Sequence, residues 1–304
     1  MASFEEYLKE TGFKPETVYQ HRKYASYFLA WTAEASLALE QITYTEILDF
    51  ADHLKKDGKG INLINRMMLA VRYYFTWLQS INQISYNPAA GISLKGTLRT
   101  VPHDLLEKAE LGHLYESYTI KDERTHRNKV ILGLLVYQAL TREELETLRP
   151  EHLKLREGKI NVPKTGKQNS RILALQPFQI IDLQEYILLI RPKILTGQGS
   201  GRPGRKPGTY KAVEEIQRLF VSMNSQEDLK NSLLHLNHAL RKLNPKYKHA
   251  VQIRQSVITE WLKEKDLRTV QYMAGHRYVS STERYKTNNL EDLKEALSKY
   301  HPLR

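Results

Sequence analysis

Apolar residues recur at helical spacing over residues 1–95, and the spacing divides this stretch into three main helices. Each of three sets of side chains returns to one face after three or four residues. The sets are Tyr24, Tyr27, Phe28 and Trp31; Ile47, Phe50, Ala51 and Leu54; and Ile64, Met68, Val71, Phe75 and Leu78. Thr43 or Thr45 is placed to cap the second helix, and Gly58 and Gly60 to break the chain after it. Asn87-Pro88 is expected to end the third helical region.

The third helix has a polar face opposite its apolar stripe. Its residues are Asn62, Asn65, Arg66, Arg72 and Tyr73. A polar helix face is ordinarily solvated. Because this one combines amide, guanidinium and aromatic groups, it also suits a helix laid against DNA. Both interpretations stay open at this point.

The residues after 103 mix helical and strand patterns. Helical spacing covers residues 104–119 and 124–139 and returns from about residue 178 to the end. Two short β-type runs at 159–162 and 171–175 flank a turn that contains Gly166 and Asn169, which predicts a hairpin. Residues 91–103 have no period and contain Gly, Lys, Arg and Pro, as a basic linker does. We therefore expect a helical domain at 1–95, a linker at 96–103 and a second domain at 104–304.

The composition indicates a globular protein of the cytoplasm. Of the 304 residues, 41% are apolar and 26% are charged, which disfavours a wholly disordered chain. Cysteine is absent, so disulfides, thiolate metal sites and cysteine nucleophiles are excluded. The N-terminus, MASFEEYLKE, lacks the apolar core of a signal peptide. The longest apolar run, Val130 to Leu140, is about half a membrane span and predicts a buried helix.

The net charge is strongly basic and unevenly distributed. The chain has 46 Lys and Arg against 34 Asp and Glu, a net charge of +12, and residues 241–286 alone hold 11 against 4. Such an excess favours a polyanionic partner: nucleic acid first, an anionic membrane surface second. The membrane is disfavoured because no amphipathic helix joins a cationic rim to a Trp/Phe face.

The basic segment contains three short motifs in a fixed order. Arg254-Gln255-Ser256 precedes an apolar helix, Gly275-His276 ends the next one, and Tyr285 stands nine residues after His276. Ser280 and Glu283 have the spacing of a capping box, which predicts Tyr285 near a helix start. Upstream lie Glu144–Leu148 followed by His152-Leu153, and then Pro163–Lys167. In order and spacing these elements resemble the tyrosine recombinase (phage integrase) family, whose members include the Xer proteins.

These residue types suit phosphoryl transfer on DNA. The transition state places extra negative charge on the non-bridging oxygens, and planar, permanently charged guanidinium groups stabilise such charge. A phenol can attack phosphorus and form a covalent phosphotyrosine, and a positioned lysine can protonate the leaving oxygen. The bond energy stays in the phosphotyrosine, so rejoining needs no ATP.

The resemblance implies a fold, a reaction and partners. The fold class is mainly α, with a helical core-binding domain followed by a mixed α/β catalytic domain that contains a small β-hairpin or sheet. The enzyme is a site-specific recombinase that acts through a 3′-phosphotyrosyl intermediate without metal or cofactor. Its partners are duplex DNA with inverted-repeat core sites and, in some relatives, an accessory DNA-bending protein. It acts as a homotetramer whose C-terminal tails, here residues 287–304, are exchanged between protomers.

The resemblance also assigns roles to residues. Tyr285 is the nucleophile, Arg254 binds the phosphate, His276 has a role in the active site, and Lys164 donates the proton, with Lys167 as the competing lysine. The expected catalytic set is Tyr285, Arg254, His276, Lys164 and Arg142. The expected DNA-binding set is Asn62, Asn65, Arg66, Arg72, Tyr73, Lys167 and Arg277.

The sequence departs from the family pattern at two places. Counting back from Glu144-Leu145 puts Thr141 at the family's first arginine, and only a one-residue shift brings Arg142 there. Val251 stands where the family has a histidine; His249 is nearby but out of register, and Gln255 replaces the second histidine. These departures support an alternative, a catalytically weak or inactive DNA-binding relative that acts as an accessory protein. The joint presence of Lys164, Arg254, His276 and Tyr285 argues against it.

Overall fold

The computed structural model describes residues 3–96, 104–196, 217–223 and 229–286. The chain divides into two compact units, Met1–Arg99 and Thr100–Arg304, and the division falls inside the expected linker. Residues 97–103 of that linker and the expected tail at 287–304 lie outside the described residues. Each unit is described by itself.

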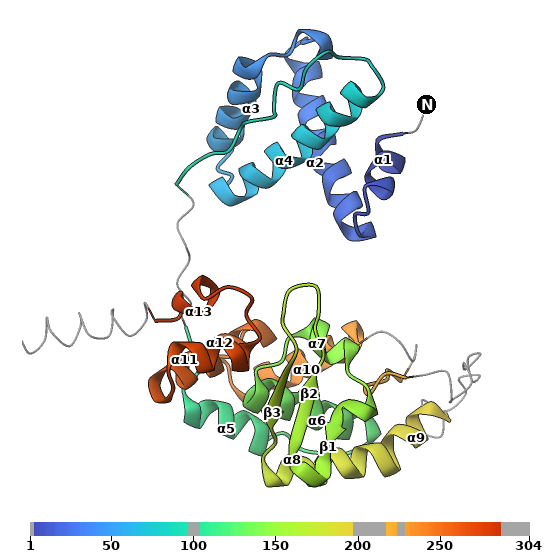
Figure 1. Ribbon diagram of the computed structural model, residues 1–304, viewed down its shortest axis with the longest axis vertical. Helices are drawn as coiled ribbons and strands as arrows, with labels where there is room; N and C mark the ends of the chain where they lie inside the picture. Colours follow the sequence, from blue (N-terminus) through green and yellow to red (C-terminus); the bar gives the residue numbers. More distant parts are fainter. Residues whose placement is uncertain (1–2, 97–103, 197–216, 224–228, 287–304) are drawn as a thin grey trace, which may run out of the picture. The chain divides into compact units, whose positions relative to one another are not determined.

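The first unit is helical (Figure 1). Its elements are α1 (Phe4–Glu10), α2 (Pro15–Glu34), η1 (Leu39–Gln41), α3 (Tyr44–Lys56) and α4 (Ile61–Ser80). Thr43 caps α3 through a capping box with Glu46, and Gly58 adopts a left-handed φ of 75° after the helix. The apolar stripes of α3 and α4 are buried as predicted, with Ile47, Phe50 and Phe75 at the centre of the core.

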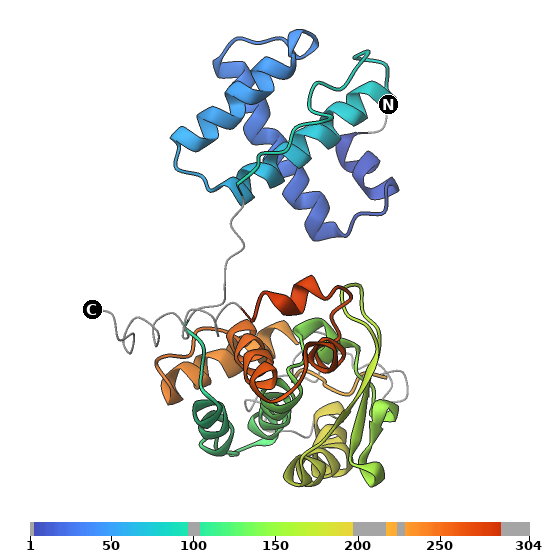
Figure 2. The ribbon, with the colours of Figure 1, turned by 60° about the vertical axis from the view of Figure 1, so that its left-hand side comes forward.

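Two details of this unit differ from the sequence prediction. Tyr27 is 48% exposed, because α2 buries the face that contains Val18, Ala25 and Phe28, and Tyr27 points about 100° away from Phe28. The third helix ends at Ser80 rather than at Asn87-Pro88. The segment after it turns back along α4 (Figure 2), and its amides and carbonyls bind side chains of that helix.

The second unit combines helices with a small antiparallel sheet. Its helices are α5 (Lys108–Glu116), α6 (Glu123–Gln138), α7 (Arg142–Thr147), α8 (Pro177–Glu185), the π-helical turn η4 (Tyr186–Ile190), α9 (Arg191–Leu195), α10 (Lys230–Leu243), α11 (Ala250–Glu264), α12 (Leu267–Ala274) and α13 (Ser280–Glu283). The strands are β1 (Leu153–Lys154), β2 (Lys159–Val162) and β3 (Arg171–Ala174), and two 3-10 turns flank β1, η2 (Pro150–His152) and η3 (Leu155–Glu157). The predicted hairpin of β2 and β3 is therefore present. Strand β1 was not predicted, because a strand of two residues shows no alternating pattern in the sequence.

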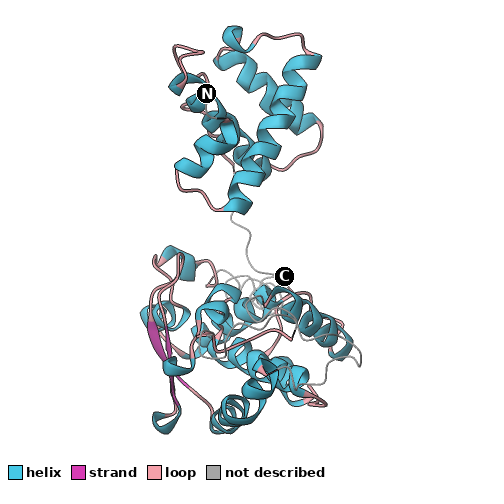
Figure 3. Cartoon of the chain, turned by 90° about the vertical axis from the view of Figure 1, so that its right-hand side faces the viewer, coloured by secondary structure: helices cyan, strands magenta, loops and turns pink. Residues whose placement is uncertain are grey.

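The sheet lies at one side of this unit's helices (Figure 3), in the order β1-β2-β3. Val162 pairs with Arg171 and Ile160 with Leu173, so these residues share one face of the hairpin. Helix α6 is the core of the unit, since nearly all its residues from His126 to Gln138 are buried, as the apolar run predicts. Within the described residues, no helix is both long and apolar enough to cross a membrane.

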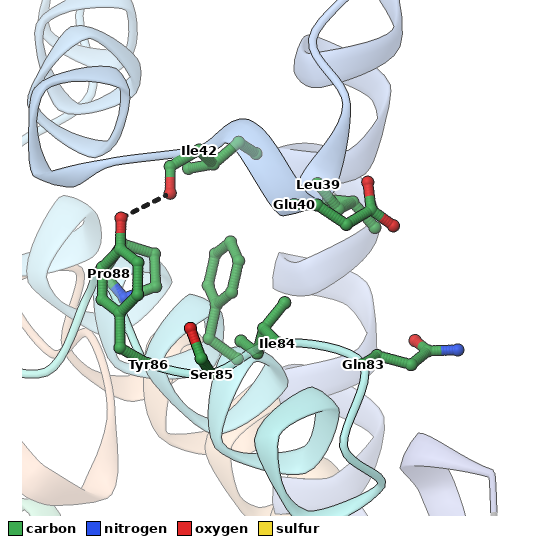
Figure 4. Close-up of a pocket in the computed structure, with 9 residues that line it drawn as sticks. Leu39, Glu40, Ile42, Gln83, Ile84, Ser85, Tyr86 and Pro88 are labelled. Atoms are coloured by element: carbon green, nitrogen blue, oxygen red, sulfur yellow. Dashed lines mark hydrogen bonds between the residues drawn. The ribbon is translucent and has the colours of Figure 1, made fainter.

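A pocket of about 180 Å³ opens in the first unit, between η1 and the segment after α4 (Figure 4). Tyr86 stands at one side and donates a hydrogen bond of 3.4 Å to the carbonyl of Ile42. The lining residues are Leu39, Glu40, Ile42, Phe75, Gln83, Ile84, Ser85, Tyr86 and Pro88. None of the side chains expected to contact DNA lines this pocket.

Candidate active site

The site begins at the turn between α6 and α7. Ala139 ends α6 with a left-handed φ of 52°, a conformation that costs energy for a residue with a side chain. Thr141 then caps α7: its hydroxyl accepts from the amide of Glu144, and Glu144 Oε2 accepts from the amide of Thr141 at 2.8 Å. This reciprocal cap fixes the carboxylate of Glu144 in the interior, where the residue is fully buried.

Arg171, the first residue of β3, is the main partner of that carboxylate. The burial of β3 alternates, so Arg171 faces inward with Leu173 while Ile172 faces out. Its Nη1 donates to Glu144 Oε1, and its Nε donates to the carbonyl of Met273 at 2.7 Å. Burial opposes ionisation of Glu144, but the hydrogen bond and charge of Arg171 lower its pKa below the ordinary value. The pair is therefore charged in the interior.

Arg254 adds a second buried guanidinium to the same carboxylate. It lies on α11, is only 8% exposed, and places Nη1 3.9 Å from Glu144 Oε2. Its Nη1 also donates to the carbonyl of Ala139, and its Nη2 donates to the carbonyl of Ala274 at 2.6 Å. Arg254 thus ties the strained end of α6 to the end of α12.

Val251 and His249, the two residues near the position where the family has a histidine, both lie at the start of α11. Val251 is 59% exposed on the first turn of α11. His249 is the N-cap of α11, where its Nδ1 accepts from the amide of Gln252 at 3.1 Å. His249 therefore caps α11 in this structure. It is out of register with the family's histidine, as the sequence predicts.

His276 follows a glycine that ends α12. Gly275 has a left-handed φ of 69°, and a Cβ there would lie 2.5 Å from Arg171 Nη1, so conformation and space both require glycine. The His276 Nδ1 lies 2.8 Å from Thr282 Oγ1. Burial, followed by the charges of Arg254 and Arg171, lowers the pKa of His276 to about 4. The imidazole is therefore neutral near pH 7.

We expect the neutral state of His276 to make stability depend on pH. The unfolded chain protonates this histidine near pH 6.5, the folded chain only near pH 4. The stabilisation is thus fully present above pH 6.5 and is lost as pH falls toward 4, by about 3 kcal/mol. Urea unfolding of the wild type and of His276→Gln at pH 7 and pH 4.5 measures it. The variant should lose less stability on acidification; equal losses would contradict the assignment.

Tyr285 lies against His276. The two rings stack with centroids 6.1 Å apart and an interplanar angle of 9°, and Tyr285 is 7% exposed. Burial raises the pKa of the Tyr285 hydroxyl, while the charges of Arg254 and Arg284 oppose the rise. The expected capping box is not formed: α13 begins after Val279 without a side-chain cap, and Tyr285 follows the end of this short helix. The reason is that the helix starts one residue too early for Ser280 to act as its cap.

The loop of the β2–β3 hairpin reaches the red segment that contains α13 (Figure 2), and it docks beside His276. Gln168 and His276 pair in an isolated antiparallel β-bridge, and the amide of Asn169 donates to the carbonyl of Gly275 at 2.8 Å. Thr165 is buried in the loop, where its hydroxyl donates to Gln168 Oε1 at 2.9 Å. The two candidate lysines, Lys164 and Lys167, are exposed on this docked loop.

Arg277 and Arg142 are the other two cations predicted to act in this unit. Arg277 is exposed, and its Nη2 lies 3.5 Å from the carbonyl of Thr165, so it faces the same hairpin loop. The side chain of Arg142 is 51% exposed, and its Nε donates to Glu146 Oε1 at 2.7 Å, one turn further along α7. Thr141 contacts Glu144 through the reciprocal cap of α7. The structure therefore brings Tyr285, His276 and Arg254 together, sets the lysine loop beside them, and pairs Arg142 with Glu146.

The polar face of α4 is largely used inside its own unit. Asn65 exchanges two hydrogen bonds with the backbone of Leu94, at 3.0 and 2.8 Å. Arg72 donates to the carbonyls of Ala89 and Ile92, and the ring of Tyr73 packs edge-on against Phe13 and His21. Asn62 and Arg66 are exposed. The solvated-face interpretation is thus wrong for Asn65 and Arg72, while DNA contact stays a prediction for this face.

A matched pair of variants separates these two roles. Arg72→Ala removes the side-chain donor to the carbonyl of Ile92 and one of two donors to the carbonyl of Ala89, and it should lower the free energy of unfolding by about 1–2 kcal/mol. Arg66→Ala should leave stability unchanged and weaken DNA binding, with the slope of log affinity against log salt reduced by about 1. Urea unfolding and salt-dependent binding measure both variants. An unchanged salt slope for Arg66→Ala removes this residue from the interface.

Arg171 and the central position of Glu144 were not predicted from the sequence. A signal for Arg171 was available, since strand alternation places it on the same face as Leu173 and Leu175. An arginine at an inward position of a strand needs a buried acid as partner. Which acid it is depends on the tertiary fold, because Glu144 lies 27 residues earlier in the chain.

Two family models match the chain. The model described as the phage integrase family matches residues 104–291, and that of the phage integrase N-terminal SAM-like domain matches residues 1–81. Tyrosine recombinase XerC of Oceanobacillus iheyensis is 25% identical, and the match covers 99% of this chain and 95% of that protein. Tyrosine recombinase XerC of Escherichia coli O127:H6 is 23% identical, with coverages of 98% and 95%.

Solved structures share the fold. XerH site-specific recombinase bound to a palindromic difH substrate has a TM-score of 0.70 at 18% identity, covering 92% of this chain and 79% of that one. A lambda integrase dimer bound to a COC′ core site has a TM-score of 0.58 at 14% identity, with coverages of 93% and 92%. The predicted fold class, mainly helical with a small sheet in the second unit, is confirmed. With more than half of its length matched by the family model, the chain belongs to the phage integrase family and is a tyrosine recombinase, as its motifs predict.

Proposed function

We propose that this chain recombines specific sites in duplex DNA, with Tyr285 as the nucleophile and a 3′-phosphotyrosyl intermediate. The observation that supports it most is the stack of Tyr285 on His276, with the charge of Arg254 acting on both residues. A buried phenol beside a neutral imidazole and a guanidinium has the groups that transesterification of a phosphodiester needs.

In the proposed step, the phenolic oxygen of Tyr285 attacks the phosphorus of the scissile diester. A Tyr–O–P bond forms as the phenol loses its proton to Nε2 of His276, the bond from phosphorus to the 5′ oxygen breaks, and Lys164 gives that oxygen a proton. Neutral His276 holds Thr282 through Nδ1, which leaves Nε2 to accept the phenolic proton. A 5′ hydroxyl from the other DNA site reverses the step and rejoins the strand, so no ATP, metal or cofactor enters this scheme.

The phosphate site is proposed to use Arg254, Arg142 and the hairpin lysines. Arg254 needs only to exchange a carbonyl for a phosphate oxygen. Arg142 has to leave Glu146 before it can reach the phosphate. Lys164 stays the proposed proton donor and Lys167 the alternative, because both are exposed on the loop that is docked beside His276.

The role of Arg142 is open to a direct comparison. If Arg142 serves cleavage, Arg142→Ala should reduce the rate of covalent adduct formation on a nicked suicide substrate by about 10²–10³, because a donor to the transition state is lost. Thr141→Ala should reduce the rate much less, since a hydroxyl has no charge to contribute, and should mainly weaken the cap of α7. Normal cleavage by Arg142→Ala would show that the one-residue shift is wrong.

The partners follow from the same proposal. The basic charge and the DNA complexes named for XerH and lambda integrase support duplex DNA as the partner. We propose contacts from Asn62, Asn65, Arg66, Arg72 and Tyr73 of a core-binding domain at 1–95, and from Lys167 and Arg277 of a catalytic domain at 104–304. Inverted-repeat core sites, a synaptic homotetramer with exchanged tails at 287–304 and an accessory DNA-bending protein complete the proposal. The reaction is assigned to the cytoplasm, on chromosomal or mobile-element DNA.

The alternative function is a DNA-binding relative without catalysis. Thr141 and Val251 motivate it, because they stand where the family has an arginine and a histidine. In the structure Thr141 is the N-cap of α7 and Val251 is exposed. The stacked Tyr285 and His276 argue against it. The suicide substrate decides between the two: a denaturant-resistant adduct supports the enzyme, and tight binding without an adduct supports the accessory protein.

A further inference from the structure

The buried part of the active site contains two guanidinium groups and one carboxylate. Arg171 and Arg254 both approach Glu144, and they donate to the successive carbonyls of Met273 and Ala274 at the end of α12. Carbonyls at a helix C-terminus have a partial negative charge, so both cations are favourably placed. The end of α12 is therefore held by two charges that meet at one acid.

Arg171 lies directly beneath the turn that presents His276. A Cβ at Gly275 would be 2.5 Å from Arg171 Nη1 and 3.0 Å from its Cζ. The side chain of Arg171 has no exposed surface. Its position is thus fixed on one side by Glu144 and on the other by the glycine turn.

One buried nitrogen of the Arg171 guanidinium, Nη2, is an unsatisfied donor within the described residues. A buried charged donor without a partner is costly, and neutral side chains of the same shape would avoid that cost. Stability of the fold alone therefore does not account for a guanidinium at this position.

We propose that Arg171 is a positioning residue for strand cleavage: it holds in place the His276 turn and Glu144, the acid that Thr141 caps at the family's first-arginine position. The inference rests on the proposed function for its catalytic meaning. Thr141 provides only a cap at that position, and the side chain of Arg142 pairs with Glu146. Arg171 donates a hydrogen bond to Glu144, and Arg254 approaches the same carboxylate at 3.9 Å.

The charge of Arg171 has a measurable target in His276. The charged groups that face this imidazole are Arg254 from α11, Arg171 from β3, Arg284 after α13 and Glu144 from α7. Three of these are cations that favour the neutral ring, and Glu144 opposes them. Removing Arg171 leaves Glu144 less compensated, so His276 should protonate at higher pH.

The test compares Arg171→Gln, which removes the charge, with Arg171→Lys, which keeps it. Titration of the His276 ring by NMR in the full-length protein should show the midpoint raised by about one pH unit in Arg171→Gln and little changed in Arg171→Lys. The rate of adduct formation on a nicked substrate falls as the pH is lowered and His276 becomes protonated. In Arg171→Gln this fall should begin at a correspondingly higher pH. Arg156→Gln, an exposed arginine of the same unit, is the matched control and should match the wild type in both measurements.

A purely structural role predicts a different outcome. The adduct rate would then fall by the same factor at every pH, and the midpoint of His276 would stay at its wild-type value; this result overturns the proposal. If Arg171→Gln does not fold, the neutral pair Glu144→Gln/Arg171→Gln removes both buried charges together, and Glu144→Gln alone is its reference. The proposal then predicts a higher midpoint in the double variant than in Glu144→Gln, and equal midpoints overturn it. Absence of an adduct with wild-type protein would count against the proposed function, whereas the NMR titration still tests Arg171.

Discussion

Tyr285→Phe should abolish the covalent protein–DNA adduct while leaving DNA binding and folding intact. The substitution removes the attacking oxygen and keeps the ring that stacks on His276 at 6.1 Å, so packing is preserved. The measurement is a denaturing gel of a nicked suicide substrate, with binding and thermal unfolding followed in parallel.

The matched control is Tyr278→Phe. Tyr278 is 71% exposed and lies seven residues before Tyr285 in the same segment, so its loss should leave the adduct unchanged. An adduct that survives Tyr285→Phe but is lost in another tyrosine variant would assign the nucleophile elsewhere.

Arg254→Lys should lower the rate of adduct formation by about 10²–10³. The guanidinium of Arg254 reaches two carbonyls in different elements, those of Ala139 and Ala274, and remains charged although it is buried. An ammonium has no planar fork, so it cannot keep one of these carbonyls and at the same time present a fixed donor to the phosphate in place of the other. Single-turnover kinetics on the nicked substrate measure the loss.

Arg268→Lys is the control for this change. Arg268 is an exposed arginine of α12 that donates to Gln271 on its own helix, and its replacement should leave the rate unchanged. A loss smaller than tenfold in Arg254→Lys would show that Arg254 holds α6 and α12 together without acting on the phosphate.

Much of the fold could be predicted from the spacing of apolar residues. The stripes of α3 and α4 and the apolar run in α6 became core because burial of such a stripe is what stabilises a helix in a domain. The prediction failed at Tyr27, where a large aromatic residue was counted as apolar although it points away from the buried face. It also failed for β1, since two residues give no period to detect.

The polar residues were harder to interpret. Asn65 and Arg72 looked like a solvated or DNA-facing surface, because the pattern within one helix does not show that residues 87–94 return to cover it. The pair of Arg171 and Glu144 was hidden for the same reason, as its members belong to β3 and α7. By contrast, Arg254, His276 and Tyr285 were predicted because their order and spacing resemble a known family, and the structure brings the three residues together.

The central claim is that Tyr285 attacks the scissile phosphate, and one measurement tests it most directly. The wild-type protein is incubated with a nicked suicide substrate containing its own core site, and the trapped peptide is identified by mass spectrometry. We expect the DNA to be attached through a 3′ phosphate to the oxygen of Tyr285. Attachment to a different residue, or site-specific binding with no adduct at all, would contradict this account.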